Sequence, residues 1–247
     1  LIVFTLLGGT LLAVVLNQIF EIETDRLMER TANRPLVTGE INKKSAYVYS
    51  TSIGLVGFLV LYTQTTELAA LIALSANIFY SFIYTLVLKP RTNQNIVIGG
   101  AAGAAPVLIG WAATGTNLDT GSWLLFLLVF LWTPAHFWAL SIDKLNDYKD
   151  ANFPMLPTQE SYKRTSIFIG LYSCATVLTS LLLAPILQLG MVYLLLSLIF
   201  GLYLMYKSYQ LYRKQIKAIS YFVFSNTYLA VIFLSMVADI FITLSSI

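Results

Sequence analysis

The sequence predicts an all-α, polytopic membrane protein, and three observations carry that prediction. Of the 247 residues, 57% are hydrophobic and only 11% are charged, whereas a soluble domain carries about 25% charged residues. The apolar residues form eight long runs, and backbone polar groups in lipid have to be satisfied within helices. The charged residues gather in alternate loops between these runs. A single cysteine, Cys174, excludes an internal disulfide framework.

Each predicted span is close to the roughly 20 residues that cross a bilayer. The eight spans are residues 1–20, 45–62, 67–88, 95–114, 122–142, 165–184, 189–209 and 219–244. Leu1 already lies inside an apolar run with no signal-peptide pattern before it. We therefore expect that an N-terminal segment is missing from this sequence.

All 15 Lys and Arg residues lie in the loops after the first, third, fifth and seventh spans. Because basic loops face the cytoplasm or an organelle matrix, these four loops are predicted to lie on that side. A bacterial cytoplasmic membrane is the first expectation, and a mitochondrial inner membrane fits the same pattern. The net charge of +3 follows from this bias and gives no reason to expect nucleic acid.

A weak internal repeat divides the single predicted domain, residues 1–247. Asn33-Arg34-Pro35-Leu36 follows the first span, and Asn152-Phe153-Pro154-Met155 follows the fifth. Four helices separate the two motifs, so residues 1–114 and 122–244 would be parallel four-helix repeats. Transporters also contain parallel repeats, so this feature alone does not indicate an enzyme.

Carboxylates cluster directly after two of the apolar runs. Asn17, Glu21 and Asp25 are four residues apart and share one helix face. This pattern is typical of a solvated helix end held by salt bridges with Arg26 and Arg30. Like charges at this spacing are nevertheless destabilising without a cation between them. A second pair of carboxylates with the same spacing, Asp143 and Asp147, lies in another charged loop.

A divalent cation with a phosphate substrate would account for both clusters. Mg²⁺ takes oxygen ligands and joins carboxylates to phosphate groups. Basic side chains would hold the remaining phosphate oxygens. The candidates are Arg30 and Arg34 in the first loop, and Lys89 and Arg91 in the third.

Several polar residues within the spans allow two interpretations. His136, the only histidine, either packs through a hydrogen bond or lines a cavity near Pro134. Asn77, Tyr80 and Tyr84 share a helix face and serve interhelical hydrogen bonding or a pocket. The stretch GGAAGAAP, residues 99–106, permits close helix packing.

Four stretches carry a resemblance to a known family. NQIFEIETDRLMERTANRPL (17–36) resembles the first signature of the UbiA-type intramembrane prenyltransferases, which follows an N-x-x-x-[DE]-x-x-x-D pattern. Residues 84–111, 130–157 and 224–229 are similar to the haem-modifying branch, the protoheme IX farnesyltransferases. The similarity spans almost the whole chain. Members commonly have Arg-Asp where this chain has Ile22-Glu23. Glu23 keeps the charge on a longer side chain and Ile22 removes a cation, so this departure bears on the metal geometry of the first cluster and not on its presence.

The resemblance implies a bundle of nine helices, of which eight are visible and the first is missing. It implies transfer of a farnesyl group from farnesyl diphosphate to a vinyl group of haem B, with water addition, to give haem O, and possible coupling to a downstream haem A synthase. Mg²⁺ is the implied cofactor. The implied catalytic residues are Asn17, Glu21, Asp25 and Asp147, and the metal ligands are Glu21, Asp25, Asp143 and Asp147. The implied diphosphate contacts are Arg30, Arg34, Lys89 and Arg91, and the haem or prenyl pocket residues are His136, Tyr84, Asn77 and Tyr148.

Two alternatives remain open. One is a UbiA-type prenyltransferase acting on a quinone precursor, against which the haem-type stretches argue. The other is a solute or ion transporter. Transporter carboxylates lie near the bilayer midplane, whereas the sequence predicts these carboxylates at one membrane surface.

Overall fold

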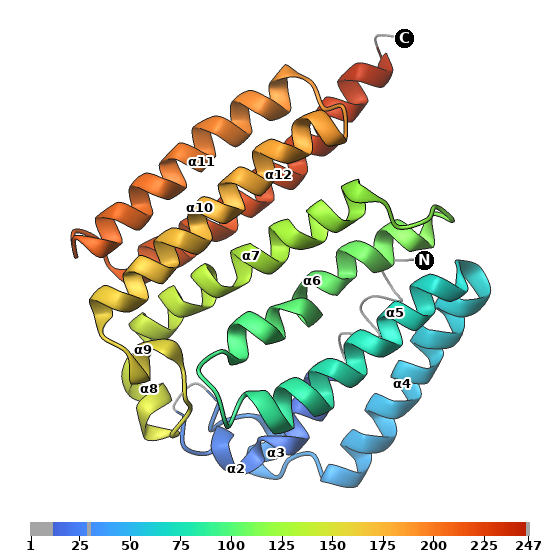
Figure 1. Cartoon of the computed structure of the whole chain (residues 1–247). Helices are drawn as coiled ribbons and strands as arrows, with labels where there is room; N and C mark the ends of the chain where they lie inside the picture. Colours follow the sequence, from blue (N-terminus) through green and yellow to red (C-terminus); the bar gives the residue numbers. More distant parts are fainter. Residues whose placement is uncertain (1–11, 29–30, 246–247) are drawn as a thin grey trace. The chain divides into compact units, whose positions relative to one another are not determined.

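A computed structural model describes residues 12–28 and 31–245 (Figure 1). Every regular element in these ranges is a helix. The chain divides into two compact units. The first holds the described residues up to Leu118 together with Leu145–Thr158, and the second holds Asp119–Lys144 and the described residues from Gln159 onward.

The first unit contains three long hydrophobic segments and a set of short helices. Residues 12–20 are helical and run into α2. The elements that follow are α2 (Ile22–Asp25), α3 (Pro35–Thr38), α4 (Lys43–Gln64), α5 (Glu67–Ile78), the π-helix η1 (Phe79–Leu88), α6 (Asn95–Ala113) and α8 (Leu145–Asp150). Helix α9 (Leu156–Gln159) lies where the chain passes to the second unit.

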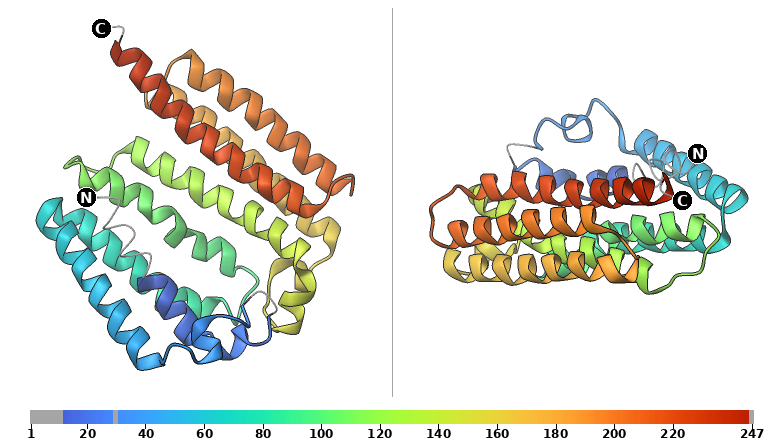
Figure 2. Two further views of the ribbon diagram at one scale, coloured as in Figure 1. Left: turned by 180° about the vertical axis from the view of Figure 1, so that it is seen from behind. Right: turned by 90° about the horizontal axis from the view of Figure 1, so that it is seen from above.

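The second unit is a bundle of four long helices. They are α7 (Thr120–Asp143), α10 (Tyr162–Ile186), α11 (Met191–Tyr212) and α12 (Ala218–Ser245). Helix α7 packs on α10 and α12, and α11 packs on the same two helices, so the four close into a ring. The neighbouring positions of α11 and α12 can be followed in both views of Figure 2.

Seven helices of the described chain are long and apolar enough to cross a membrane, which confirms an integral multi-pass membrane protein. They agree with the predicted second to eighth spans to within three residues at every boundary. The first predicted span, residues 1–20, lies mostly outside the described residues. The nine-helix count is therefore not confirmed.

Side chains in the loops set where the long helices begin. Asn42 accepts a hydrogen bond from the Ser45 N–H at 2.7 Å and caps α4. Asp119 forms a reciprocal capping box with Ser122 at the start of α7. Short polar side chains at these positions satisfy backbone donors that have no partner within the helix. Turn chemistry thus defines the ends of segments whose interiors are uniformly apolar.

A π-helix interrupts the third predicted span. From Phe79 the hydrogen bonds run across five residues, as with the Lys89 N–H and the Tyr84 carbonyl at 2.8 Å. The wider turn moves the side chains after Phe79 out of the register of α5. Such π-helical turns are frequent at functional sites.

Candidate active site

Asn17, Glu21 and Asp25 form one buried face at the start of the first unit. The Glu21 N–H donates to the Asn17 carbonyl at 3.0 Å, and the Asp25 N–H donates to the Glu21 carbonyl at 2.7 Å. These bonds continue the helix of residues 12–20 into α2. All three side chains are at least nine-tenths buried. The predicted shared face is therefore present, and it points into the protein.

Each of the two carboxylates has its own cation. Lys89 Nζ lies 2.6 Å from the Glu21 carboxylate, and Arg34 Nη1 lies 2.6 Å from Asp25 Oδ2. The two cations offset the like-charge repulsion between positions four apart. Arg26 instead pairs with Glu23 on the exposed surface at 3.1 Å. A simple solvated helix end, in which Arg26 would hold Asp25, does not describe this geometry.

The π-helix supplies the partner of Asn17. Asn17 Nδ2 donates to Thr85 Oγ1 at 3.3 Å, and that hydroxyl donates to the Tyr80 carbonyl at 2.9 Å. The second bond spans five residues, so it depends on the π-helical turn. The interruption in the third span therefore holds the first residue of the acidic face in position.

The loop that carries Asp147 packs on the first loop through an apolar cluster. The cluster consists of Met28, Ile96, Tyr148, Ala151, Phe153 and Met155. Met28 is three residues from Asp25, and Tyr148 directly follows Asp147. The two carboxylate-bearing loops thus converge within the first unit, beside the start of α6.

Asn95 and Phe153 connect the two converging loops to Lys89. Asn95 is fully buried, and its Nδ2 lies 3.4 Å from the Lys89 carbonyl and 3.3 Å from the Pro154 carbonyl. Lys89 Nζ also lies 4.9 Å from the centroid of the Phe153 ring, a cation–π distance. One lysine is thereby held by a carboxylate, an aromatic face and its own backbone.

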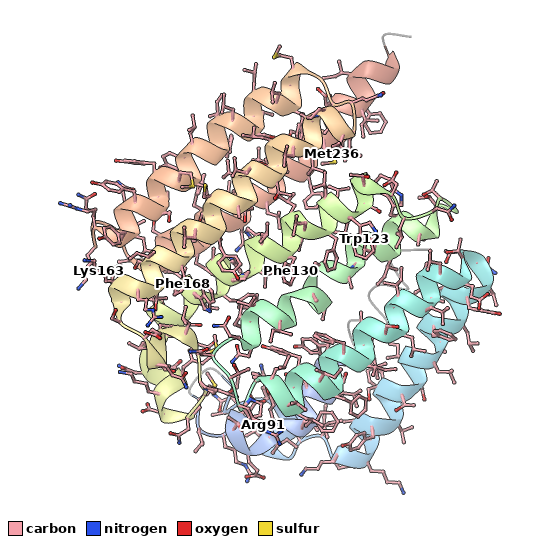
Figure 3. All side chains as sticks on the ribbon, viewed as in Figure 1. Arg91, Trp123, Phe130, Lys163, Phe168 and Met236 are labelled. Atoms are coloured by element: carbon pink, nitrogen blue, oxygen red, sulfur yellow. The ribbon has the colours of Figure 1, made fainter. Side chains whose placement is uncertain are left out.

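The other charged residues predicted for the site are not part of the Glu21–Lys89 and Asp25–Arg34 ion pairs. Arg91 is exposed just beyond the end of η1 (Figure 3). Asp147 is half-buried on α8. Asp143 ends α7 in the second unit and lies 4.0 Å from Lys144. Arg30 lies outside the described residues.

Among the described residues, no three His, Cys, Asp or Glu side chains form a ready-made metal-ligand group. Glu21 and Asp25 still offer hard oxygen donors of the type that Mg²⁺ prefers. Their spacing places them on one face, and their present partners are cations. The donor set therefore fits Mg²⁺, with Lys89 and Arg34 occupying the carboxylates in this structure.

A cavity of about 380 Å³ lies among residues 12–14, α4, α5, η1 and α6. Its walls are apolar except at Asn77 and Tyr80. Tyr84 stacks on Tyr80 at 5.2 Å between ring centroids and lies over Gly99, where a Cβ would collide with the Tyr84 ring. Gly99 therefore permits close packing, as the sequence indicates, whereas a Cβ at Gly103 of the same stretch would meet open space.

His136 belongs to the second unit and is held tightly. Its ring is sandwiched between Trp132 and Phe222, with 4.2 Å between centroids on each side. Its Nδ1 lies 2.7 Å from Ser225 Oγ, and that hydroxyl donates to the Phe222 carbonyl at 2.7 Å. Ser225 therefore accepts from Nδ1–H, which leaves the lone pair of the neutral imidazole on Nε2.

Comparison with known proteins identifies this architecture. The model of the UbiA prenyltransferase family matches residues 1–237. The chain belongs to the UbiA prenyltransferase family. It is 42% identical over 238 residues to a protoheme IX farnesyltransferase of Thermus thermophilus, covering 94% of this chain and 39% of that protein. It is also 42% identical to the protoheme IX farnesyltransferase of Clavibacter sepedonicus, over 97% of this chain and 81% of that protein.

The chain thus spans about two-fifths of the length of the Thermus relative. Solved structures show the same fold. A digeranylgeranylglyceryl phosphate synthase structure matches with a TM-score of 0.78 at 21% identity, over 96% of this chain and 84% of that one. A UbiA homologue from Archaeoglobus fulgidus, bound to DMAPP and Mg²⁺, matches with a TM-score of 0.64 at 17% identity, over 95% and 87% of the two chains.

Three residues of the site were missed by the sequence interpretation: Thr85, Asn95 and Phe153. Thr85 and Asn95 are short polar residues within the predicted spans 67–88 and 95–114 and look like ordinary interhelical contacts. Their roles depend on partners 68 and 59 residues away. The Asn-Phe-Pro-Met motif that contains Phe153 belongs to the weak repeat and to the family-like stretch 130–157, and neither pattern predicts its contact with Lys89. Its position in a basic, acidic loop was the one signal that pointed to the site.

Proposed function

We propose that the protein transfers a farnesyl group from farnesyl diphosphate to a vinyl group of haem B and produces haem O. The relatives of 42% identity are protoheme IX farnesyltransferases, and this supports the choice of haem as acceptor. The single structural observation that carries the proposal is the buried Asn17–Glu21–Asp25 face with its two paired cations. An apolar span ending in such a centre suits a diphosphate with a lipid tail.

The position of this centre argues for an enzyme over a transporter. Glu21 and Asp25 follow the helix of residues 12–20, and Lys89 follows the last residue of η1. They therefore gather at the ends of apolar segments. Transporter sites lie near the middle of spans that are broken there.

The chain's own residues would exchange partners when substrate arrives. Glu21 and Asp25 would hold Mg²⁺, and Asp143 and Asp147 are proposed as further ligands. Bound Mg²⁺ would stabilise the negative charge that develops on the departing diphosphate. The cations released from the carboxylates would then bind phosphate oxygens. The proposed diphosphate contacts are Lys89, Arg34, Arg30 and Arg91.

Thr85 accepts one N–H of Asn17 Nδ2, and the second N–H would donate to a diphosphate oxygen and orient the substrate. Cleavage of the allylic C–O bond gives a farnesyl cation, which the haem vinyl group attacks. Water then adds to the resulting benzylic-type cation and loses a proton. The products are a haem with a hydroxyethylfarnesyl side chain, diphosphate and one proton.

Four residues are proposed for the haem or prenyl pocket: His136, Asn77, Tyr84 and Tyr148. His136 would present Nε2, because Ser225 occupies Nδ1. Asn77 and Tyr80 line an apolar cavity in the first unit, and such a wall suits an isoprenoid chain.

The setting of the enzyme is proposed from the charge pattern. The basic loops would face the cytoplasm of a bacterial inner membrane, or the matrix of a mitochondrion. A haem A synthase would consume the product. The parallel repeat of residues 1–114 and 122–244 stays a prediction.

The test is a reconstitution of the full chain with haem B, farnesyl diphosphate and Mg²⁺, followed by chromatographic separation of haems. We expect haem O to form, to disappear with a chelator, and to return when Mg²⁺ is added. Full turnover in metal-free buffer would contradict the proposed role of the carboxylates. Prenylation of a quinone precursor with haem B left unchanged would assign the other acceptor class.

A further inference from the structure

An aromatic groove lies on the surface of the second unit, between α11 and α12. It has a volume of about 510 Å³. Helix α11 contributes Ile199, Phe200, Leu202, Tyr203 and Tyr206, and α12 contributes Phe224. Leu202 and Ile199 are exposed by 62% and 58%. Because both helices are membrane spans, these side chains face lipid.

The groove is preformed by ring packing between the two helices. Phe200 and Phe224 stack with 6.3 Å between centroids and an interplanar angle of 5°. Tyr203 meets Phe224 edge-on at 4.7 Å. Aromatic pairs in these geometries stabilise their own arrangement. The walls therefore need no reorganisation to receive an extended hydrocarbon chain.

A cation is held at one end of the groove. Lys207 Nζ lies 5.5 Å from the centroid of the Tyr203 ring and 3.4 Å from Ser220 Oγ. Tyr203 thus lines the groove, and its ring contacts the ammonium group of Lys207. Ser220 accepts a hydrogen bond from Nζ, and no other acceptor among the described residues bonds this ammonium group. Between Arg164 and Asp239 the sequence has four basic residues and no acidic residue.

We propose that this groove binds an anionic phospholipid, with its phosphate on Lys207 and an acyl chain along Phe200, Tyr203 and Phe224. A preformed apolar wall ending in an ammonium group matches an amphiphile with one anionic head. Haem B would bring two carboxylates to a groove that ends at Lys207. Among the described residues, Lys207 is the cation that contacts a residue of the groove, and this cation and the exposure to lipid favour the phospholipid.

Lipid retention on the purified full chain tests the proposal. Native mass spectrometry would compare bound phosphatidylglycerol with phosphatidylcholine of identical acyl chains. We expect wild-type protein to retain phosphatidylglycerol preferentially, and Lys207→Gln to lower this preference about fivefold. Lys163→Gln is the matched control, because it removes an exposed positive charge at the start of α10 (Figure 3).

Two further variants separate the groove from diffuse charge and from misfolding. Phe224→Leu keeps an apolar wall without the stacked ring and should shorten retention of phosphatidylglycerol. Lys207→Arg keeps the charge and should keep the preference. Equal losses in Lys207→Gln and Lys163→Gln would overturn the proposal. Displacement of the lipid by haem B, with a raised KM for haem in Lys207→Gln, would assign the groove to haem instead.

Discussion

The two units bury polar groups in different ways. The first unit buries carboxylates against cations, as in the Glu21–Lys89 and Asp25–Arg34 pairs. The second buries hydroxyl groups against one another. Ser173 Oγ lies 2.6 Å from Tyr221 Oη, and Tyr228 Oη lies 2.8 Å from Ser180 Oγ. Among the described residues, the buried ion pairs lie in the first unit, whereas the ion pairs of the second unit, Lys144–Asp143 and Arg164–Glu160, lie at its surface.

This difference indicates where chemistry can occur. A carboxylate paired with a lysine can exchange that partner for a metal ion, and the lysine can then bind phosphate. A hydroxyl pair within a bundle has no such alternative and serves packing. Among the described residues of the second unit, the buried acid also has partners. Asp239 accepts from the backbone N–H groups of Gly190 and Tyr193 and stabilises the N-terminus of α11.

The largest expected effect comes from removing charge in the first unit. Asp25→Asn keeps the side-chain shape but removes the negative charge proposed to bind the metal. Loss of one group that stabilises developing charge costs about 10²–10³ in kcat, and we expect at least that for Asp25→Asn and for Asp147→Asn. Haem O formation by purified variants measures it. Helical content should stay near wild type, because the half-buried Arg34 can turn to water.

Arg26→Gln is the matched control for this prediction. It removes an ion pair one residue from Asp25, but that pair is exposed and worth about 0–1 kcal/mol. We expect nearly full turnover. If Arg26→Gln lost as much activity as Asp25→Asn, electrostatics at the helix end would explain the cluster and the metal role would be wrong.

Hydropathy predicted most of the fold because the membrane requires it. A span must be apolar and about 20 residues long, so the ends of α4, α6 and α7 could be read to within a few residues. The π-helix could not be predicted in this way. Hydropathy reports which residues face lipid and carries no information on whether a hydrogen bond spans four or five residues.

The site was predictable where its residues are close in sequence. Glu21 and Asp25 share a face through the helical period alone. The sequence predicts that the nearby basic residues contact the diphosphate of the substrate. In the structure two of them, Lys89 and Arg34, pair with the carboxylates themselves. Thr85 and Asn95 were not predicted, because their partners come from distant segments and no local pattern records such a contact.

An intermediate effect is expected from loosening the joint between the loops. Asn95→Ala removes the amide that reaches the carbonyls of Lys89 and Pro154. Each hydrogen bond of this type contributes about 0.5–1.5 kcal/mol, so kcat/KM for farnesyl diphosphate should fall about 2- to 10-fold. Asn93→Ala is the control, since Asn93 bonds only its neighbour Gln94 among the described side chains. Equal rates in the two variants would contradict a positioning role.

The smallest expected effect lies in the second unit. Tyr228→Phe deletes the hydroxyl that donates to Ser180 but keeps the fully buried ring. Hydrogen bonds between membrane helices contribute about 0.6 kcal/mol on average, because the unfolded chain in lipid also finds partners. We expect a Tm lowered by a few degrees and haem O formation close to wild type. Tyr209→Phe makes the same chemical change at an exposed position and should leave Tm unchanged.

A loss of activity in Tyr228→Phe comparable with that in Asp25→Asn, at unchanged Tm, would mean that the hydroxyl network takes part in the reaction. The assignment of this hydroxyl pair to packing would then be wrong.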